Sequence, residues 1–153
     1  MRALRRMAAA AVLATLGAVA GVAGVAGPAQ AAASVPTTAT PGTPPSGGWT
    51  CNDSPDAQSC FKWYGDQWWL KSDSNWPATI TWVNELRDYN GTYREHRRGT
   101  CEGSELARGR WGVCNMDYWE SSNENEFGGH GSRLRWYVCA GFCSTEATRE
   151  NNG

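Results

Sequence analysis

Residues 99–120 read GTCEGSELARGRWGVCNMDYWE, and this stretch decides how we interpret the rest of the chain. Cys101 and Cys114 are separated by twelve residues rich in Gly, Glu and Arg, a composition that makes a flexible loop unless its ends are joined. A disulfide that closes a loop of this size contributes about 3 kcal/mol to stability. We therefore expect Cys101 and Cys114 to be bonded and the loop to lead into a strand at residues 110–116.

The N-terminus has the features of a secretory signal peptide. Three arginines precede a run of Ala, Val, Leu and Gly at residues 7–27, and small residues follow at 29–31. The run approaches the about 20 residues that span a bilayer, but its Ala and Gly content and its cleavage-like end favour a removable leader over an anchor. We expect residues 1–31 to be a signal peptide, the mature protein to be secreted and extracellular, and no membrane to be a partner.

The charge of the mature chain argues against a nucleic-acid partner. Three of the 14 Lys and Arg residues lie in the signal segment, which leaves 11 basic residues against 15 acidic ones, a net charge near −4. Nucleic-acid binding depends on Lys and Arg side chains that neutralise phosphates. The basic cluster of Arg94, Arg97 and Arg98 is typical of a solvated strand face.

Composition divides the mature chain into three parts. Residues 32–48 contain mainly Ser, Thr, Pro, Gly and Ala, so we expect a disordered tail with little to bury. The folded domain is predicted at residues 49–143, followed by a frayed polar C-terminus at residues 144–153. A single domain of under about a hundred residues has a small core and gains from covalent links. We expect it to be monomeric.

The cysteines supply those links. Secretion places them in an oxidising setting, which favours disulfides. Metal binding is disfavoured because no Cys-x-x-Cys pair occurs and the only histidines are His96 and His130, so we assign no metal and no cofactor. Six cysteines allow 15 pairings, and beyond Cys101–Cys114 the sequence leaves open whether the first two pair with each other or with the last two. The six are Cys51, Cys60, Cys101, Cys114, Cys139 and Cys143.

Short strand signals alternate with turn signals along the domain. Aromatic and β-branched residues predict strands at residues 61–64, 67–71, 78–86, 110–116 and 134–139. Asn90-Gly91 predicts a hairpin with a two-residue turn. That turn would set Arg87 opposite Arg94, and opposed like charges are unfavourable, so a longer loop is the alternative. With helical periodicity confined to residues 104–108, the pattern predicts an all-β fold, a small disulfide-linked sandwich or barrel.

The domain resembles a group of small secreted proteins of high-GC Gram-positive bacteria. The shared pattern covers most of the mature domain and consists of Gly65-Asp66, Trp68, Leu70, Gly99-Thr100-Cys101, residues 109–117, Glu120, Arg135 and Cys139. The group has an Asp-Gly turn where this chain has Asn75-Trp76-Pro77-Ala78, so that turn should differ. The resemblance implies a secreted, disulfide-linked, all-β protein, and it implies no activity and no site residues.

Nine tryptophans suggest a binding surface in addition to a core. Core packing accounts for Trp68, Trp82, Trp111 and Trp136. Strand alternation sends Trp69 to the face opposite Trp68 and Leu70, so we expect Trp69 to be exposed. Aromatic patches on soluble proteins mark interaction sites. The hypothesis is a non-catalytic module that presents Trp69, with Tyr64, Trp76 and Trp119, to an extracellular carbohydrate or protein surface.

Two other functional classes stay open. A secreted proteinase inhibitor would use the loop between Cys101 and Cys114, because a braced loop binds with a smaller loss of entropy. Its specificity residue would be Leu106, Arg108 or Arg110. A small secreted hydrolase would need carboxylates in contrasting environments, and candidates are Asp66, Asp73, Asp117, Glu120, Glu124 and Glu126. No spacing supports either a catalytic group or a calcium loop at residues 121–126, so we assign no catalytic residue.

Overall fold

The computed structural model describes residues 34–119 and 123–151, and the expected signal peptide at residues 1–31 lies outside the described residues. The described part of the chain forms strands joined by turns and loops. In chain order the strands are β1 (Val35–Thr38), β2 (Thr40–Pro41), β3 (Trp49–Ser54), β4 (Ala57–Lys62), β5 (Gln67–Ser72), β6 (Thr79–Arg87), β7 (Tyr93–Glu102), β8 (Trp111–Asn115), β9 (Ser132–Ala140), β10 (Phe142–Cys143) and β11 (Ala147–Glu150). No helix in these ranges has the length and apolar character needed to cross a membrane.

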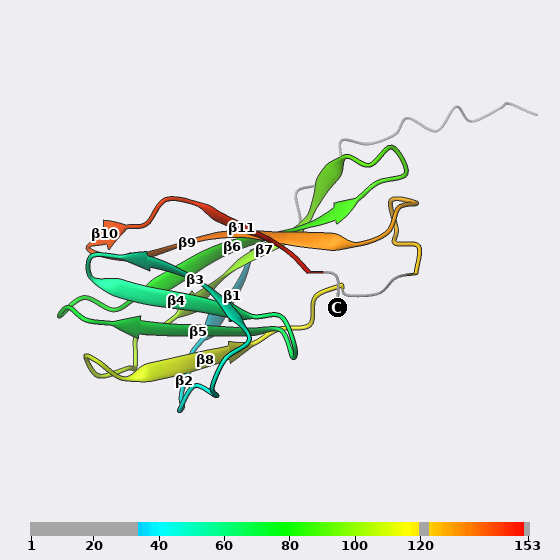
Figure 1. The fold of residues 1–153 in the computed structure, drawn as a ribbon. Helices are drawn as coiled ribbons and strands as arrows, with labels where there is room; N and C mark the ends of the chain where they lie inside the picture. Colours follow the sequence, from blue (N-terminus) through cyan, green and yellow to red (C-terminus); the bar gives the residue numbers. More distant parts are fainter. Residues whose placement is uncertain (1–33, 120–122, 152–153) are drawn as a thin grey trace, which may run out of the picture.

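The strands form two sheets that pack face to face (Figure 1). Sheet A has the strand order β1-β7-β6-β9-β10, and β11 also pairs with β9. Sheet B has the order β2-β8-β5-β4-β3. Neighbouring strands are antiparallel, apart from the parallel pair β1 and β7. The predicted all-β fold is confirmed, and of the two predicted forms the structure is the sandwich.

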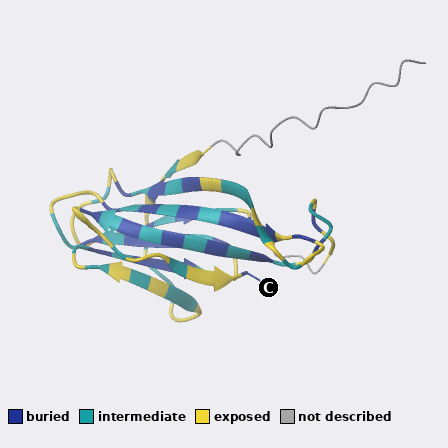
Figure 2. Ribbon diagram, turned by 90° about the horizontal axis from the view of Figure 1, so that it is seen from above, coloured by how far each residue is buried: buried dark blue, intermediate teal, exposed yellow. Residues whose placement is uncertain are grey.

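Strand alternation builds the core between the sheets (Figure 2). Along β9 every second residue from Ser132 to Ala140 is buried and the residues between them are half-buried, because successive side chains point to opposite faces. Trp68 of sheet B and Trp136 of sheet A are each at most 1% exposed, and their ring centroids lie 5.2 Å apart across the layers. The indole N–H of Trp68 donates to the Tyr118 hydroxyl oxygen at 2.7 Å, so this polar atom is satisfied within the core.

One disulfide joins the two sheets. Cys101 of β7 and Cys114 of β8 are bonded, their Cα atoms are 5.9 Å apart, and both residues are buried, which confirms the predicted pair. The other two bonds each join directly opposed residues of one hairpin, Cys51–Cys60 on β3 and β4 and Cys139–Cys143 on β9 and β10. No free cysteine occurs in the described ranges. Three disulfides in so small a domain are compatible with an extracellular location.

Residues 35–38 and 40–41 are strands of the sandwich, where a disordered tail was expected at residues 32–48, of which 32 and 33 lie outside the described residues. β1 pairs with the end of β7, β2 pairs with β8, and Ala39 between them is buried. Two glycines make room for this segment. A Cβ at Gly99 would lie 2.3 Å from the Val35 carbonyl oxygen, and a Cβ at Gly112 would lie 3.0 Å from the Ala39 Cβ. Composition was a poor guide because backbone hydrogen bonds hold the segment with little burial of apolar side chains.

The C-terminal segment also forms a strand, where a frayed end was expected at residues 144–153. β11 pairs with β9 over its whole length. Asn151 is buried: its backbone N–H donates to the Ser132 carbonyl oxygen at 2.9 Å, and its side-chain N–H donates to Asp66 Oδ1 at 3.2 Å. The sequence did not predict this strand, because the mainly polar residues of β11 show no alternation of apolar and polar side chains. The domain therefore extends beyond residues 49–143 on both sides.

The hairpin of β6 and β7 has a longer loop than a two-residue turn at Asn90-Gly91. β6 ends at Arg87 and β7 begins at Tyr93, and these two residues are paired, so Arg87 does not oppose Arg94. Asp88 holds the loop, because its Oδ1 accepts hydrogen bonds from the backbone N–H groups two and four residues further on, both at 2.9 Å. The charge conflict seen in the sequence is thus resolved by the longer loop.

Candidate functional site

The outer face of sheet A carries charges that pair with one another. Glu85 of β6 contacts the guanidinium groups of Arg133 and Arg135 on β9, the latter at 3.1 Å. On β7, Arg98 and Glu95 form an ion pair at 2.6 Å. These side chains already satisfy each other's charge, so this face has the character of a solvated surface rather than a binding site.

The outer face of sheet B contains Trp69, but Trp69 is only 5% exposed, so the expectation of an exposed side chain was wrong. The rings of Trp49 and Trp69 meet edge to face with centroids 6.3 Å apart. The backbone at Gly42 also lies so close that a Cβ there would be 3.1 Å from the indole. Alternation assigned the correct face, away from Trp68. The cover comes from Trp49 and from the N-terminal segment that was expected to be disordered.

Trp76 differs from Trp69, because it lies in the turn between β5 and β6 and is 68% exposed. Hydroxyl groups fix the backbone of this turn. Ser72 Oγ donates to the Trp76 carbonyl oxygen at 2.6 Å, the Trp76 N–H donates to Ser74 Oγ at 3.1 Å, and the Ser74 N–H donates to Ser72 Oγ at 3.2 Å. Pro77 further restricts the residue before it to extended conformations. An aromatic ring is therefore held out in water on a fixed backbone.

A pocket of about 280 Å³ lies beside Trp76. The loop between β7 and β8 supplies its other wall with Ser104, Leu106 and Arg108, and Asn75 lines it from the turn. An aromatic residue next to hydroxyl, amide and guanidinium groups is a combination that can orient a small polar ligand such as a sugar. The exposed ring and the polar lining together make this pocket the candidate site.

The two walls of this pocket are hydrogen-bonded to each other. The Gly109 N–H donates to the Ser72 carbonyl oxygen and the Gly103 N–H donates to the Ala78 carbonyl oxygen, both at 2.8 Å. The β5–β6 turn and the β7–β8 loop lie at the same end of the sandwich, on the left in Figure 1. The site is consequently formed before any ligand arrives.

The residues considered for protease inhibition do not lie on an extended loop. Leu106 packs against the core, and its Cδ1 would lie 2.4 Å from a Cβ at Gly112. The N–H groups of Leu106 and Arg110 each close a turn, at 3.1 and 3.0 Å. Arg108 and Arg110 are exposed. A loop that enters a protease must be extended, so the geometry gives the inhibitor hypothesis no support.

The other aromatic residues of the predicted platform lie far from Trp76. Tyr64 is 83% exposed in the turn between β4 and β5, and Trp119 is half-buried after β8. These two connections are at the end of the sandwich opposite the β5–β6 turn (Figure 1). The structure therefore brings none of the three predicted companions to Trp76, and its neighbours in the pocket are mostly polar, apart from Pro77 and Leu106.

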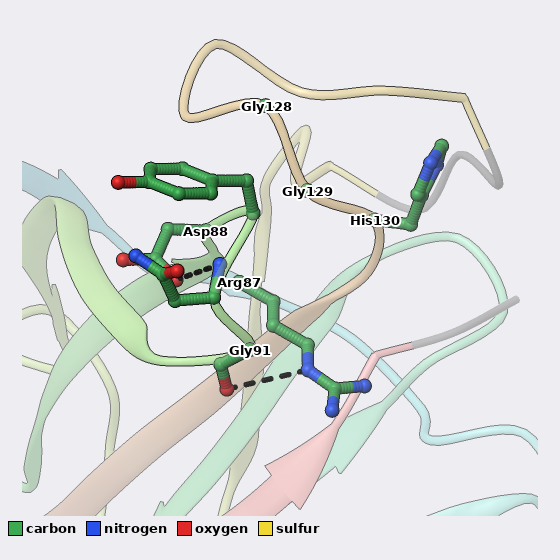
Figure 3. A pocket seen from close by; sticks show the side chains of 8 residues that line it. Arg87, Asp88, Gly91, Gly128, Gly129 and His130 are labelled. Carbon is green, nitrogen blue, oxygen red and sulfur yellow. Dashed lines mark hydrogen bonds between the residues drawn. The ribbon is translucent and has the colours of Figure 1, made fainter.

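A second hollow, of about 380 Å³, lies at that opposite end between the β6–β7 and β8–β9 loops (Figure 3). Asp88 in its wall is buried and also pairs with Arg94 Nε at 3.0 Å. Burial raises the pKa of Asp88, but the backbone hydrogen bonds and Arg94 outweigh it and lower the pKa below its usual value. The imidazole of His130 points away from this carboxylate. The hollow brings no acid and base together.

The carboxylates considered for hydrolysis are dispersed or already bound. Asp117 and Glu124 are exposed, and Glu120 lies outside the described residues. Three others have partners: Asp66 accepts the Tyr118 N–H at 2.6 Å, Asp73 pairs with Lys71 at 3.0 Å, and Glu126 pairs with His96 at 2.7 Å. Within the described ranges no group of three His, Cys, Asp or Glu residues is placed to hold a metal ion.

Sequence reasoning missed the serines that fix Trp76. The signal was the pattern Ser72-Asp73-Ser74-Asn75-Trp76-Pro77, since serine hydroxyls bond to nearby backbone groups and proline restricts the residue before it. No sequence pattern indicated the residues on the other side of the pocket, such as Ser104, because only the fold brings the β5–β6 turn and the β7–β8 loop together.

No protein-family model, curated protein or solved structure matches the chain. The resemblance to small secreted proteins of high-GC Gram-positive bacteria rests on the residues quoted above and stays an expectation.

Proposed function

We propose that this protein is a secreted, non-catalytic module that binds carbohydrate through Trp76 and the pocket beside it. One observation carries the proposal: an indole that is 68% exposed stands on a backbone fixed by Ser72 and Ser74, at the edge of a polar pocket. Tryptophan is enriched among the residues that contribute most to binding at contact surfaces. The indole face would stack on the apolar face of a sugar ring, and the polar groups would bond to its hydroxyls.

Secretion supports a carbohydrate ligand, because polysaccharides are abundant outside cells. The composition of residues 1–31 predicts export, and three disulfides suit an oxidising setting. The pocket is small and open to solvent, which suits one or two sugar units and an affinity of about 1 mM to 1 μM. Such a module would hold the protein at a polysaccharide rather than transform it.

The test is retention of the purified protein on insoluble polysaccharides and cell-wall material, followed by titration with soluble fragments. Trp76→Ala should weaken binding at least about tenfold, as truncating a central aromatic contact does. Tyr64→Ala is the matched control, since it removes an even more exposed aromatic side chain from the opposite end. It should bind like the wild type. Equal binding by the wild type and Trp76→Ala, or equal losses in both variants, would contradict the proposal.

A further inference from the structure

The pocket beside Trp76 has a neighbour on the other side of the same loop. This second pocket measures about 130 Å³ and is lined by Gly42, Thr43, Pro44, Gly109, Arg110 and Trp111. Arg108 lines the first pocket and Arg110 lines the second, so residues 108–110 form a ridge between them. The Cα atoms of Arg108 and Arg110 are two residues apart and so at most about 7 Å from each other, a spacing that one short oligosaccharide can cover.

The ridge is fixed by backbone hydrogen bonds on both sides. The Gly109 N–H donates to the Ser72 carbonyl oxygen at 2.8 Å, which joins the ridge to the Trp76 turn. The Gly42 N–H donates to the Trp111 carbonyl oxygen at 3.0 Å, which joins the second pocket to the N-terminal segment. Gly109 has a φ of +74°, a conformation that favours glycine. The relative position of the two pockets is therefore built into the fold.

Each pocket combines a tryptophan with an arginine. Trp76 shares the first pocket with Arg108, and Trp111 shares the second with Arg110. Sequence reasoning placed Trp111 in the core, but it is half-buried on the outer face of sheet B, with Lys71 Nζ 5.5 Å from its ring centroid. The same combination thus occurs twice, once on each side of the ridge.

The two ridge arginines also differ from three arginines on the strands of sheet A. Arg98, Arg133 and Arg135 all pair with carboxylates. In the described ranges neither Arg108 nor Arg110 has a side-chain hydrogen bond or an ion pair. Their guanidinium groups can therefore donate hydrogen bonds to an anionic ligand without breaking an existing ion pair.

We propose, on the basis of the carbohydrate-binding function above, that the ligand is a linear acidic oligosaccharide with a carboxylate on successive sugars. It would lie across the ridge, with one sugar against Trp76 and another against Trp111. Arg108 and Arg110 would each bind a carboxylate, a partner that the planar guanidinium matches with two parallel hydrogen bonds. Without residues 1–31 the chain has 11 basic and 15 acidic residues, a net charge near −4, so recognition depends on this local pair rather than on a general attraction for polyanions.

The probes are linear oligogalacturonides and the same oligomers with every carboxyl group methyl-esterified, titrated calorimetrically into the full domain. The wild type should bind the acid form at least about tenfold more tightly than the ester. Arg108→Gln and Arg110→Gln should each weaken binding of the acid form about fivefold to tenfold, and the double variant about fiftyfold. Binding of the ester should change little in any of these variants. Arg87→Gln, which removes an exposed arginine from the opposite hollow, is the control and should bind both forms like the wild type.

The outcomes separate this inference from the proposed function. Equal affinity of the wild type for the acid and ester forms would overturn the inference, and so would a double variant that binds the acid form normally. If Trp76→Ala still abolished binding to neutral glycans in either case, the carbohydrate-binding function would stand without the preference for acid. Failure of the wild type to bind any polysaccharide would overturn both.

Discussion

The two ends of the sandwich use their polar side chains in different ways. At the Trp76 end, formed by the β5–β6 turn and the β7–β8 loop, Ser72 and Ser74 bond to backbone groups and leave the indole exposed. At the Asp88 end, formed by the β4–β5, β6–β7 and β8–β9 connections, Asp66 and Asp88 are themselves buried and bind the loops together. One end leaves an indole exposed on a fixed backbone, and the other uses its buried carboxylates to hold the loops.

This difference shows that a hollow in the surface is not sufficient to identify a site. The larger hollow, of about 380 Å³, is at the Asp88 end, where the charged group in its wall is already neutralised by Arg94. Both hollows adjoin an exposed aromatic residue, Tyr89 in the larger one and Trp76 in the smaller one of about 280 Å³. They differ in their arginines: Arg87 of the larger hollow donates to the Gly91 carbonyl oxygen, whereas Arg108 of the smaller one has no side-chain partner in the described ranges. A charged side chain without a partner beside a pocket is therefore a better indicator of a binding site than the volume of the pocket.

Breaking the link between the sheets should disturb both ends together and have the largest effect. Replacing both Cys101 and Cys114 with alanine removes a buried bond between the two layers and should lower the free energy of unfolding by about 3 kcal/mol or more. The Cys139–Cys143 bond joins only neighbouring strands and closes a short loop. Replacing both of these cysteines should lower the free energy of unfolding by about 2 kcal/mol or less. Denaturant unfolding measures both. A larger loss from the second pair would show that the ends do not depend on the inter-sheet bond.

At the Asp88 end, Asp66→Gly should lower stability by about 2 to 3 kcal/mol and leave carbohydrate binding unchanged. Glycine suits the positive φ of +49° at this position, so the loss reports on the carboxylate. Without the carboxylate, the buried Tyr118 N–H and the Asn151 side chain lose their acceptor. Asp117→Ala, at an exposed carboxylate nearby, is the control and should be neutral. A loss of binding together with stability would mean that the two ends are coupled.

Tyr118→Phe should cost about 1 to 2 kcal/mol, because the buried Trp68 N–H loses its acceptor. Burial raises the pKa of Tyr118 well above its ordinary value. Above about pH 10 the unfolded chain releases this proton while the folded protein keeps it, so stability should fall as the pH rises through that range. The variant should lose stability less steeply there. Equal slopes for the two proteins in pH-dependent unfolding would contradict burial of this hydroxyl.

At the Trp76 end, Ser72→Ala should have a small effect on stability, about 1 kcal/mol, and a clearer effect on binding, a loss of about threefold to tenfold. The serine fixes the Trp76 carbonyl, so its removal raises the entropy cost of placing the indole against a ligand. Asp88→Asn is the counterpart, because it removes the ion pair with Arg94 at the other end and should leave binding unchanged. Titration of both variants with the same glycan compares the two ends directly. A binding loss confined to Asp88→Asn would reverse the assignment.

The sequence predicted the parts of the fold that depend on the alternation of side chains along a strand and on a loop closed by a disulfide. The inner face of β5, the pair Cys101–Cys114 and the strands around them follow from these rules. The edge strands β1 and β11 could not be predicted, because backbone pairing with β7 and β9 holds them and their side chains carry no apolar pattern. That error led directly to the wrong expectation for Trp69, since part of the N-terminal segment covers it.

For the candidate site, the sequence supplied residues but not their grouping. Trp76, Leu106 and Arg108 were named for two unrelated functions, and the structure places all three around one pocket. Tyr64 and Trp119 were grouped with Trp76 by residue type, and they lie at the other end. Strand order decides which connections share an end of a sandwich, and strand order is set by contacts distant in sequence. Local pattern therefore identifies exposed aromatics but not their neighbours.

The nine indole N–H groups allow the central claim to be tested in one experiment. The claim is that ligand binds at the Trp76 end on a surface formed in advance. A ¹⁵N-labelled sample would be titrated with soluble fragments of the polysaccharide that retains the protein, and the indole signals would be followed by NMR. We predict that the Trp76 signal shifts most, that Trp111 follows, and that Trp63 and Trp119 at the Asp88 end do not move. Shifts confined to Trp63 and Trp119, with Trp76 unchanged, would contradict the account.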